Sequence, residues 1–141
     1  MTGNGPSTHI SWAELACHDE FKTPYPVAWF DRAVALAAEF ESLRTACAVR
    51  LGLEVAPITV ISAYRTPAHN GDIGGAGRSQ HVEGRALDVA PPHGMTVEDF
   101  GALCIELADS RGIIRGVGIY TGDNHVHIDI RPEMVLATWR G

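Results

Sequence analysis

The sequence is poor in cysteine and lacks any long hydrophobic run. Its three cysteines, Cys17, Cys47 and Cys104, are widely spaced, and an odd number cannot pair completely within one chain. Cys47 and Cys104 lie among apolar neighbours in helix-like stretches, so we expect buried free thiols there. Cys17 next to His18 offers too few partners for a zinc site. No apolar segment approaches the roughly 20 residues of a transmembrane helix, so we expect no membrane insertion.

Positive charge is also scarce. The chain has 11 lysines and arginines against 17 aspartates and glutamates, which gives a formal net charge of -6. Without a basic stripe to replace phosphate counterions, no nucleic-acid partner is expected, and neither is a polyanionic substrate. Residues 1–7 lack the basic and apolar regions of a secretory signal. The 141 residues have the length of one domain, so we predict a single domain over residues 1–141.

Two amphipathic segments are predicted to form helices. Across residues 27–51 apolar side chains recur at helical spacing, and Gly52 supplies a stop. The segment 96–112 begins with a capping signal and ends with a glycine, and its apolar residues also share one face. A serine and a glutamate three residues apart predict a shorter helical turn near residues 12–16.

Four segments are predicted to form strands. Residues 57–62 alternate β-branched side chains and are expected to form the first central strand, and residues 86–89 continue the sheet. Residues 116–120 and 125–130, joined by a turn-rich linker, indicate a hairpin. The glycine-rich stretch 66–78 is expected to be an irregular loop beside the site. This order predicts an α+β fold, a mainly antiparallel sheet with helices on one face and the site on the other.

Two short segments carry side chains of the types that bind zinc. The first, SQHVEGRALDV, contains His81 and Asp88, and the second, HVHID, contains His125 and His127. Two imidazoles and one carboxylate leave an open position on a tetrahedral zinc ion, and an open position distinguishes a catalytic site from a structural one. The two segments together therefore indicate zinc-dependent hydrolysis.

The pattern Ser-x-His-x-x-Gly-x-Ala-x-Asp, followed by a strand with His-x-His, resembles the D-alanyl-D-alanine carboxypeptidase group of zinc peptidases, metallopeptidase family fifteen. This group includes phage endolysins and VanX-type dipeptidases, and it shares its core fold with the hedgehog signalling domain. The resemblance also covers the stretches ISAYR, GGA, GIY and HID. It implies a hedgehog/D,D-peptidase-like fold and one zinc ion per chain, bound by His81, Asp88 and His127.

One position departs from the pattern of the family. Well-studied members carry an acid three residues before the last zinc-binding histidine, where it acts as general base, and here that residue is Asn124. An amide cannot accept the proton of the attacking water, so Asp123 or Asp129 is the candidate base, with Glu83 next. Asp129 shares a strand face with His127 and is equally well placed to orient that imidazole from outside the metal shell.

Arg65 and His125 complete the candidate catalytic residues. Arg65 matches an arginine of the family motif, and its planar fork suits a substrate carboxylate or an oxyanion. Its alternative role is to brace the glycine-rich loop. His125 suits a hydrogen-bond donor to the developing oxyanion, and its alternative is a solvent-facing strand residue. The remaining histidines are not expected to bind the metal; they are His9, His18, His69 and His93.

The resemblance implies a peptidase that cuts peptidoglycan stem peptides or their cross-links, at a bond involving D-alanine. A phage endolysin, a virion-associated wall hydrolase or a bacterial enzyme of prophage origin fits a chain without a recognisable signal. Such a protein is made in the cytoplasm and acts on the cell wall after release or phage-mediated delivery. Asn124 keeps a second function open, a zinc-stabilised module that binds wall peptide with weak or no cleavage.

Overall fold

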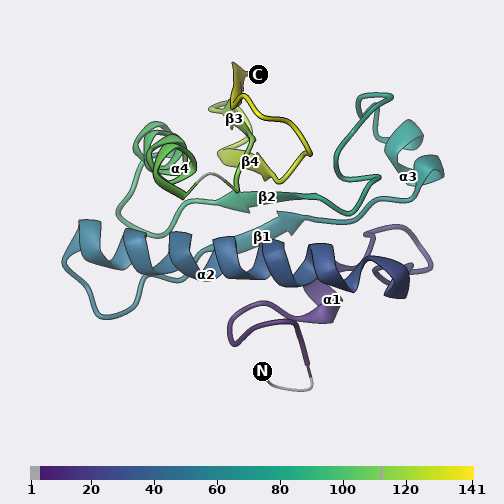
Figure 1. Ribbon diagram of the computed structural model, residues 1–141, viewed down its shortest axis with the longest axis horizontal. Helices are drawn as coiled ribbons and strands as arrows, with labels where there is room; N and C mark the ends of the chain where they lie inside the picture. Colours follow the sequence, from purple (N-terminus) through teal and green to yellow (C-terminus); the bar gives the residue numbers. More distant parts are fainter. Residues whose placement is uncertain (1–3, 112) are drawn as a thin grey trace.

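The computed structural model describes residues 4–111 and 113–141 and combines helices with a five-stranded sheet (Figure 1). The mixture of helices and sheet expected from the sequence is confirmed. In chain order the elements are α1 Trp12–Leu15, a 3-10 helix Val27–Trp29, α2 Phe30–Leu51, β1 Thr59–Ser62, α3 Pro67–Asp72, β2 Ala86–Ala90, α4 Val97–Arg111, β3 Gly116–Tyr120, β4 His125–Asp129 and β5 Ala137–Arg140.

The helices expected from the sequence are present. At the start of α1, the backbone N–H of Glu14 donates to Ser11 Oγ (3.1 Å) and the backbone N–H of Ser11 donates to the Glu14 carboxylate (2.9 Å). α2 ends at Gly52, whose φ of 67° lies in the left-handed region that favours glycine. The expected stop of α4 at Gly112 lies outside the described residues. Within the two described ranges, no helix combines the length and apolar character needed to cross a bilayer.

The strands of the sheet follow the order β1-β2-β4-β3-β5. Neighbouring strands are antiparallel except β3 and β5, which run parallel. β3 and β4 form the predicted hairpin. The prediction of β1 as a central strand was wrong, because β1 is the edge strand of the sheet that the described residues form, and Ile61 is 44% exposed there. β5 was not predicted at all.

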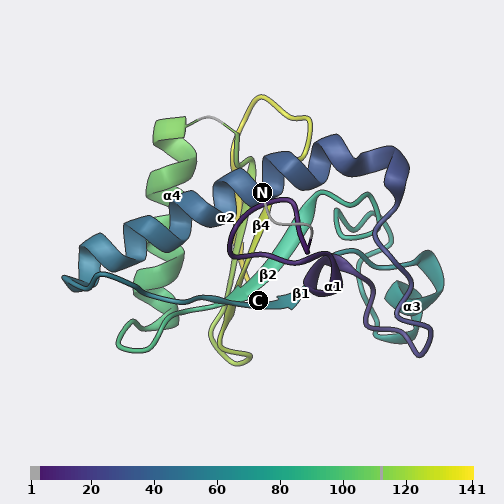
Figure 2. The same ribbon diagram turned by 90° about the horizontal axis from the view of Figure 1, so that it is seen from below.

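Helices α2 and α4 pack together against one face of the sheet (Figure 2). Leu87 and Val89 of β2 and Val126 and Ile128 of β4 are buried in the same apolar cluster as Phe40 of α2. Successive side chains of a strand point to opposite faces. The residues that alternate with these four on β2 and β4 therefore face away from the two helices, and they include the predicted ligands.

The glycine-rich stretch 66–78 was predicted to be an irregular loop. This was wrong in part, because the stretch begins with the helix α3. Thr66 Oγ1 accepts a hydrogen bond from the backbone N–H of His69 (3.1 Å), and a proline occupies the first turn. A threonine cap followed by proline is a helix start signal, although the four glycines that follow draw attention to loop structure instead.

Candidate metal centre

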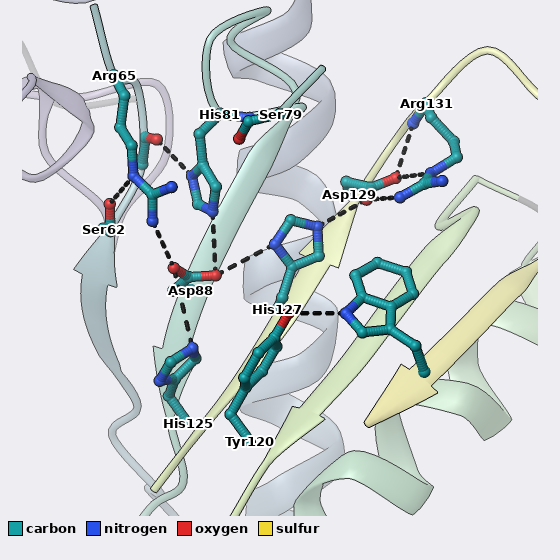
Figure 3. A network of polar contacts seen from close by, with 12 residues as sticks. Ser62, Arg65, Ser79, His81, Asp88, Tyr120, His125, His127, Asp129 and Arg131 are labelled. Atoms are coloured by element: carbon teal, nitrogen blue, oxygen red, sulfur yellow. Dashed lines mark hydrogen bonds and ion pairs between the residues drawn. The ribbon is translucent and has the colours of Figure 1, made fainter. Parts of the chain in front are cut away.

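Three side chains of ligand type meet on the sheet face away from α2 and α4 (Figure 3). His81 lies in the turn before β2, Asp88 lies on β2 and His127 lies on β4. The antiparallel register pairs Asp88 directly with His127. The three residues are buried, with 2, 6 and 8% of their surface exposed. The expectation that ligands converge from neighbouring strands holds for Asp88 and His127, whereas His81 comes from a turn.

One oxygen of Asp88 lies between the two imidazoles. Asp88 Oδ1 is 3.1 Å from His81 Nε2 and 3.2 Å from His127 Nδ1. One ligand atom from each residue lies within 4.8 Å of the other two. Ligand atoms about 2.0–2.2 Å from a tetrahedral zinc ion are roughly 3.3 Å from one another. The two distances from Asp88 Oδ1 to the imidazole nitrogens therefore match the spacing of ligands around a zinc ion.

Hydrogen bonds on the far side of each imidazole determine which ring nitrogen faces Asp88. His81 Nδ1 donates to the carbonyl of Ala63 (2.6 Å), and His127 Nε2 donates to the carboxylate of Asp129 (2.7 Å). In a neutral ring the other nitrogen then presents its lone pair to Asp88. Three acceptor atoms that face one another need a shared cation or added protons between them. The donor set therefore fits a metal ion held by oriented ligands.

Arg65 is bound into the wall of the site. It donates from Nη2 to Asp88 Oδ2 (3.1 Å), from Nε to Ser62 Oγ (3.2 Å) and from Nη1 to Asn70 Oδ1 (3.3 Å). The first contact leaves Asp88 Oδ1 turned towards the imidazoles. The third ties the end of β1 to α3, which carries Asn70. Arg65 thus positions a ligand and also braces the segment that follows α3.

Asp129 is fully buried and has all of its partners within the protein. Arg131 donates to it from Nε (2.8 Å), from Nη2 (2.7 Å) and from its backbone N–H (3.1 Å), and His127 supplies a fourth hydrogen bond. Gly116 lies opposite Asp129 on β3, where a Cβ atom would overlap the carboxylate. Asp129 does not line the cavity beside the ligands. Its position corresponds to orienting His127, the second of the two roles that the sequence left open.

Burial and hydrogen bonding have opposite effects on the pKa values of the histidines and aspartates of the site. Burial lowers the pKa of His81. Burial alone would raise the pKa of Asp88 and Asp129, but the close contacts of Asp88 with His127 and His81, and the hydrogen bonds from Arg131 and His127 to Asp129, hold both pKa values well below their usual range. His127 has a raised pKa, because its bonds to Asp129 and Asp88 outweigh its burial. Both carboxylates are therefore ionised at neutral pH, the form that attracts a cation.

A cavity of about 530 Å³ opens beside the three ligand residues, which form part of its lining. The glycine-rich segment after α3 forms another part. Side chains from the β3–β4 hairpin and from the C-terminal segment complete the lining: Tyr120, Asp123, His125, Arg131 and Trp139. The site is therefore accessible from one side, as catalysis requires.

His125 lies on the same face of β4 as His127, two residues earlier. Its Nε2 is 3.9 Å from Asp88 Oδ2, and its side chain is 16% exposed. The ring stacks on Tyr120, with centroids 4.8 Å apart and planes 15° from parallel. His125 therefore faces the cavity with a defined ring orientation and is not a solvent-facing strand residue.

Trp139 of β5 lines the cavity and was missed in the sequence. Its Nε1 donates to the hydroxyl of Tyr120 (2.7 Å), and its ring centroid lies 5.2 Å from that of His127. Gly118 on β3 makes room for the indole, since a Cβ atom there would come within 2.5 Å of it. The available signal was the pair of glycines two residues apart in β3, which leaves one strand face open to close neighbours.

Asp123 and Asn124 are neighbours in the hairpin turn between β3 and β4. Asn124 has a φ of 51°, a left-handed conformation that asparagine tolerates better than most residues. Asp123, one position earlier, is exposed and lines the cavity. Glu83 is exposed and does not line it. Among the described lining residues, Asp123 and Asp88 are the only carboxylates.

The other histidines lie away from this centre. His9 Nδ1 contacts Glu41 Oε1 (2.6 Å), while His18 and His69 line a separate cavity of about 330 Å³. In the part of the chain that the structure describes, the three residues around Asp88 are the only group of three with metal-ligand spacing. Cys17, Cys47 and Cys104 are buried and free.

Comparison with known families adds independent evidence. A family model described as Peptidase M15 matches residues 9–129, which include His81, Asp88 and His127. The chain belongs to the peptidase M15 family. M15 peptidases are metal-dependent, in agreement with the donor set. A search of curated proteins finds no match. The family match ends at residue 129, so Arg131 and Trp139 lie beyond it.

Proposed function

We propose that the protein is a zinc-dependent peptidase that hydrolyses peptidoglycan stem peptides or their cross-links. The proposal depends above all on the convergence of His81 Nε2, Asp88 Oδ1 and His127 Nδ1 beside an open cavity in an M15 peptidase. Two imidazoles and one carboxylate, with one position left for water or substrate, are a donor set of catalytic zinc sites. One zinc ion per chain would bind to these three residues.

The side chains around the ligands are positioned for different roles in the reaction. Zinc, when bound, supplies Lewis acidity that polarises a carbonyl group and lowers the pKa of water. Asp123 is the cavity carboxylate outside the ligand set, so it takes the proton of the attacking water as general base. His125, oriented by the ring of Tyr120, donates a hydrogen bond to the oxygen that gains charge. Arg65 keeps Asp88 oriented.

The position of the site on the sheet face away from α2 and α4 supports a hedgehog/D,D-peptidase-like fold, with residues 1–141 as one peptidase domain. Under this proposal the enzyme acts as a phage endolysin or a virion-associated wall hydrolase. It is then made in the cytoplasm and reaches the cell wall after release or through phage-mediated delivery.

Digestion of muropeptides tests the proposed function. The purified protein is incubated with muropeptides with and without a chelator, and products are identified by mass spectrometry. We expect cleavage products with new amino groups, lost with the chelator and restored by zinc. Released D-alanine identifies a carboxypeptidase, and separated cross-links identify an endopeptidase. Zinc-dependent binding without cleavage supports the binding module that Asn124 leaves open, and the absence of both cleavage and binding contradicts either function.

A further inference from the structure

Three arginines line the cavity, and they differ in their partners. Arg65 is bound to Asp88, Ser62 and Asn70, as described above. The guanidinium of Arg131 donates two hydrogen bonds to Asp129. Arg78 has no hydrogen bond or ion pair with any residue in the ranges 4–111 and 113–141. Among the described residues of the lining, Arg78 is therefore the arginine whose five N–H donors are all open to a ligand, whereas Arg65 and Arg131 each use part of theirs within the protein.

The backbone that carries Arg78 is held in place, although its side chain is exposed. On one side, Asn70 Nδ2 donates to the carbonyl of Ala76 (2.8 Å), and the backbone N–H of Gly75 donates to the carbonyl of Asn70 (2.8 Å). On the other, the backbone N–H of Ser79 donates to the carbonyl of Ala76 (3.1 Å). Two residues further on the chain reaches His81. The backbone of Arg78 is thus fixed, and it lies three residues before the candidate ligand His81.

The charges of the cavity favour an anionic group. Asp88 and Asp129 are each paired with an arginine, so their charges are largely balanced within the protein. The cation expected at the three ligands and the free Arg78 then exceed the single remaining lining carboxylate, Asp123. The cavity is therefore locally cationic although the chain has a net charge of -6. Such local fields attract anionic ligands of matching shape.

We infer that Arg78 is the residue that binds a carboxylate of the peptide substrate and so sets specificity for acidic peptides. A guanidinium binds a carboxylate through two parallel hydrogen bonds, and this geometry adds specificity as well as affinity. Arg65 is less suited to this role, because three of its five N–H donors are already bonded within the wall of the site. The inference takes the peptide substrate from the proposed function. The carboxylate is either the C-terminal group of the stem peptide or a side-chain carboxylate within it.

Kinetics with matched peptides test the inference. The zinc-loaded wild type, Arg78→Ala and Arg78→Lys are compared on a stem peptide, on the same peptide amidated at its C-terminus, and on the peptide amidated at its side-chain carboxylates. A hydrogen-bonded charge pair typically corresponds to about a ten- to hundredfold change in affinity. We expect Arg78→Ala to raise KM by that factor with little change in kcat, because the contact is present before and during the reaction.

The amidated peptides identify the source of the carboxylate. The KM of the wild type should rise by the same factor on the peptide that lacks the relevant carboxylate. The KM of Arg78→Ala should be the same on that peptide as on the unmodified one. Arg78→Lys should keep part of the affinity, because lysine retains the charge without the fork. Arg50→Ala, which removes an exposed arginine paired with Glu106 outside the cavity, serves as control and should change KM less than about twofold. A KM for Arg78→Ala within twofold of wild type on all peptides overturns the inference.

A binding measurement separates this inference from the proposed function. The side-chain Nε–H resonance of Arg78 is followed by NMR during titration with N-acetyl-D-alanine and with its amide. A shift with the acid alone supports the anchor even if no stem peptide is cleaved. The same response to acid and amide, or none to either, overturns it even if cleavage is observed.

Discussion

The floor and the rim of the cavity are built on different principles. The floor residues are His81, Asp88 and His127, and the rim residues are Arg78, Asp123 and His125. The floor is buried, and each of its side chains has a further polar partner that fixes its orientation. The rim is more exposed, and two of its three side chains have no polar partner among the described residues. Fixed ligands hold an ion without reorganisation, whereas unpaired side chains remain available to a substrate.

Joint replacement of the three floor residues should have the largest effect on zinc binding and on peptidase activity. Replacing His81, Asp88 and His127 together with alanine should abolish zinc binding and reduce peptidase activity to background, because no donor set remains. Metal analysis by mass spectrometry and muropeptide assays measure the two effects. The variant His69→Ala, which alters a histidine of the separate cavity, should retain both. Full zinc retention in the triple variant would remove these residues from the metal site.

Replacement of the rim acid should separate activity from metal binding. Asp123→Asn should lower kcat by about a hundred- to ten-thousandfold, the usual contribution of a general base, while zinc content stays at the wild-type level. Glu83→Gln is the matched control, because Glu83 is exposed and lies outside the cavity. If Asp123→Asn is fully active, another group is the general base, and Asp123 has no role in catalysis.

His125 should behave as a rim residue despite its place beside a ligand. His125→Ala should lower kcat by about a hundredfold or somewhat more, as removal of one donor to a developing oxyanion does in other enzymes. Zinc content should remain near that of the wild type, measured on the same preparation. A parallel loss of zinc would instead assign His125 to the floor, as a ligand.

The hydrogen bond behind His127 should affect metal affinity more than turnover. Asp129→Asn keeps the size of the buried group but removes the charge that polarises the imidazole, so zinc affinity should fall by about ten- to a hundredfold. Competition with a chelating dye measures the affinity. At saturating zinc the variant should recover most of its activity. Failure to recover, with zinc fully bound, would mean that Asp129 acts directly in the reaction.

Two of the three floor residues, Asp88 and His127, could be placed from the sequence because they belong to strands with a strict alternation. Asp88 on β2 and His127 on β4 lie opposite one another, as a two-residue period requires once the strands pair. His81 was found through the motif, and its location in a turn does not follow from periodicity. The long helix α2 and the hairpin could be predicted for the same reason, since periodicity and turn residues are local signals.

The rest of the cavity depends on contacts between distant segments. β5 lies parallel to β3, and only that pairing brings Trp139 next to Tyr120. No local sequence pattern predicts this strand. The sequence also gives no sign that Arg65 and Arg131 have carboxylate partners while Arg78 has none among residues 4–111 and 113–141, because ion pairs depend on the fold. Local sequence thus predicts the candidate metal ligands better than the residues proposed to recognise a substrate.

Zinc titration of the chelator-stripped protein tests whether His81, Asp88 and His127 bind the metal ion on which cleavage depends. Bound zinc and cleavage of muropeptides are measured on the same samples as zinc is added back. Because His81, Asp88 and His127 form one donor set, cleavage should rise in proportion to bound zinc and level off at one ion per chain. Full cleavage by the zinc-free protein, or no cleavage after one ion has bound, would contradict the account.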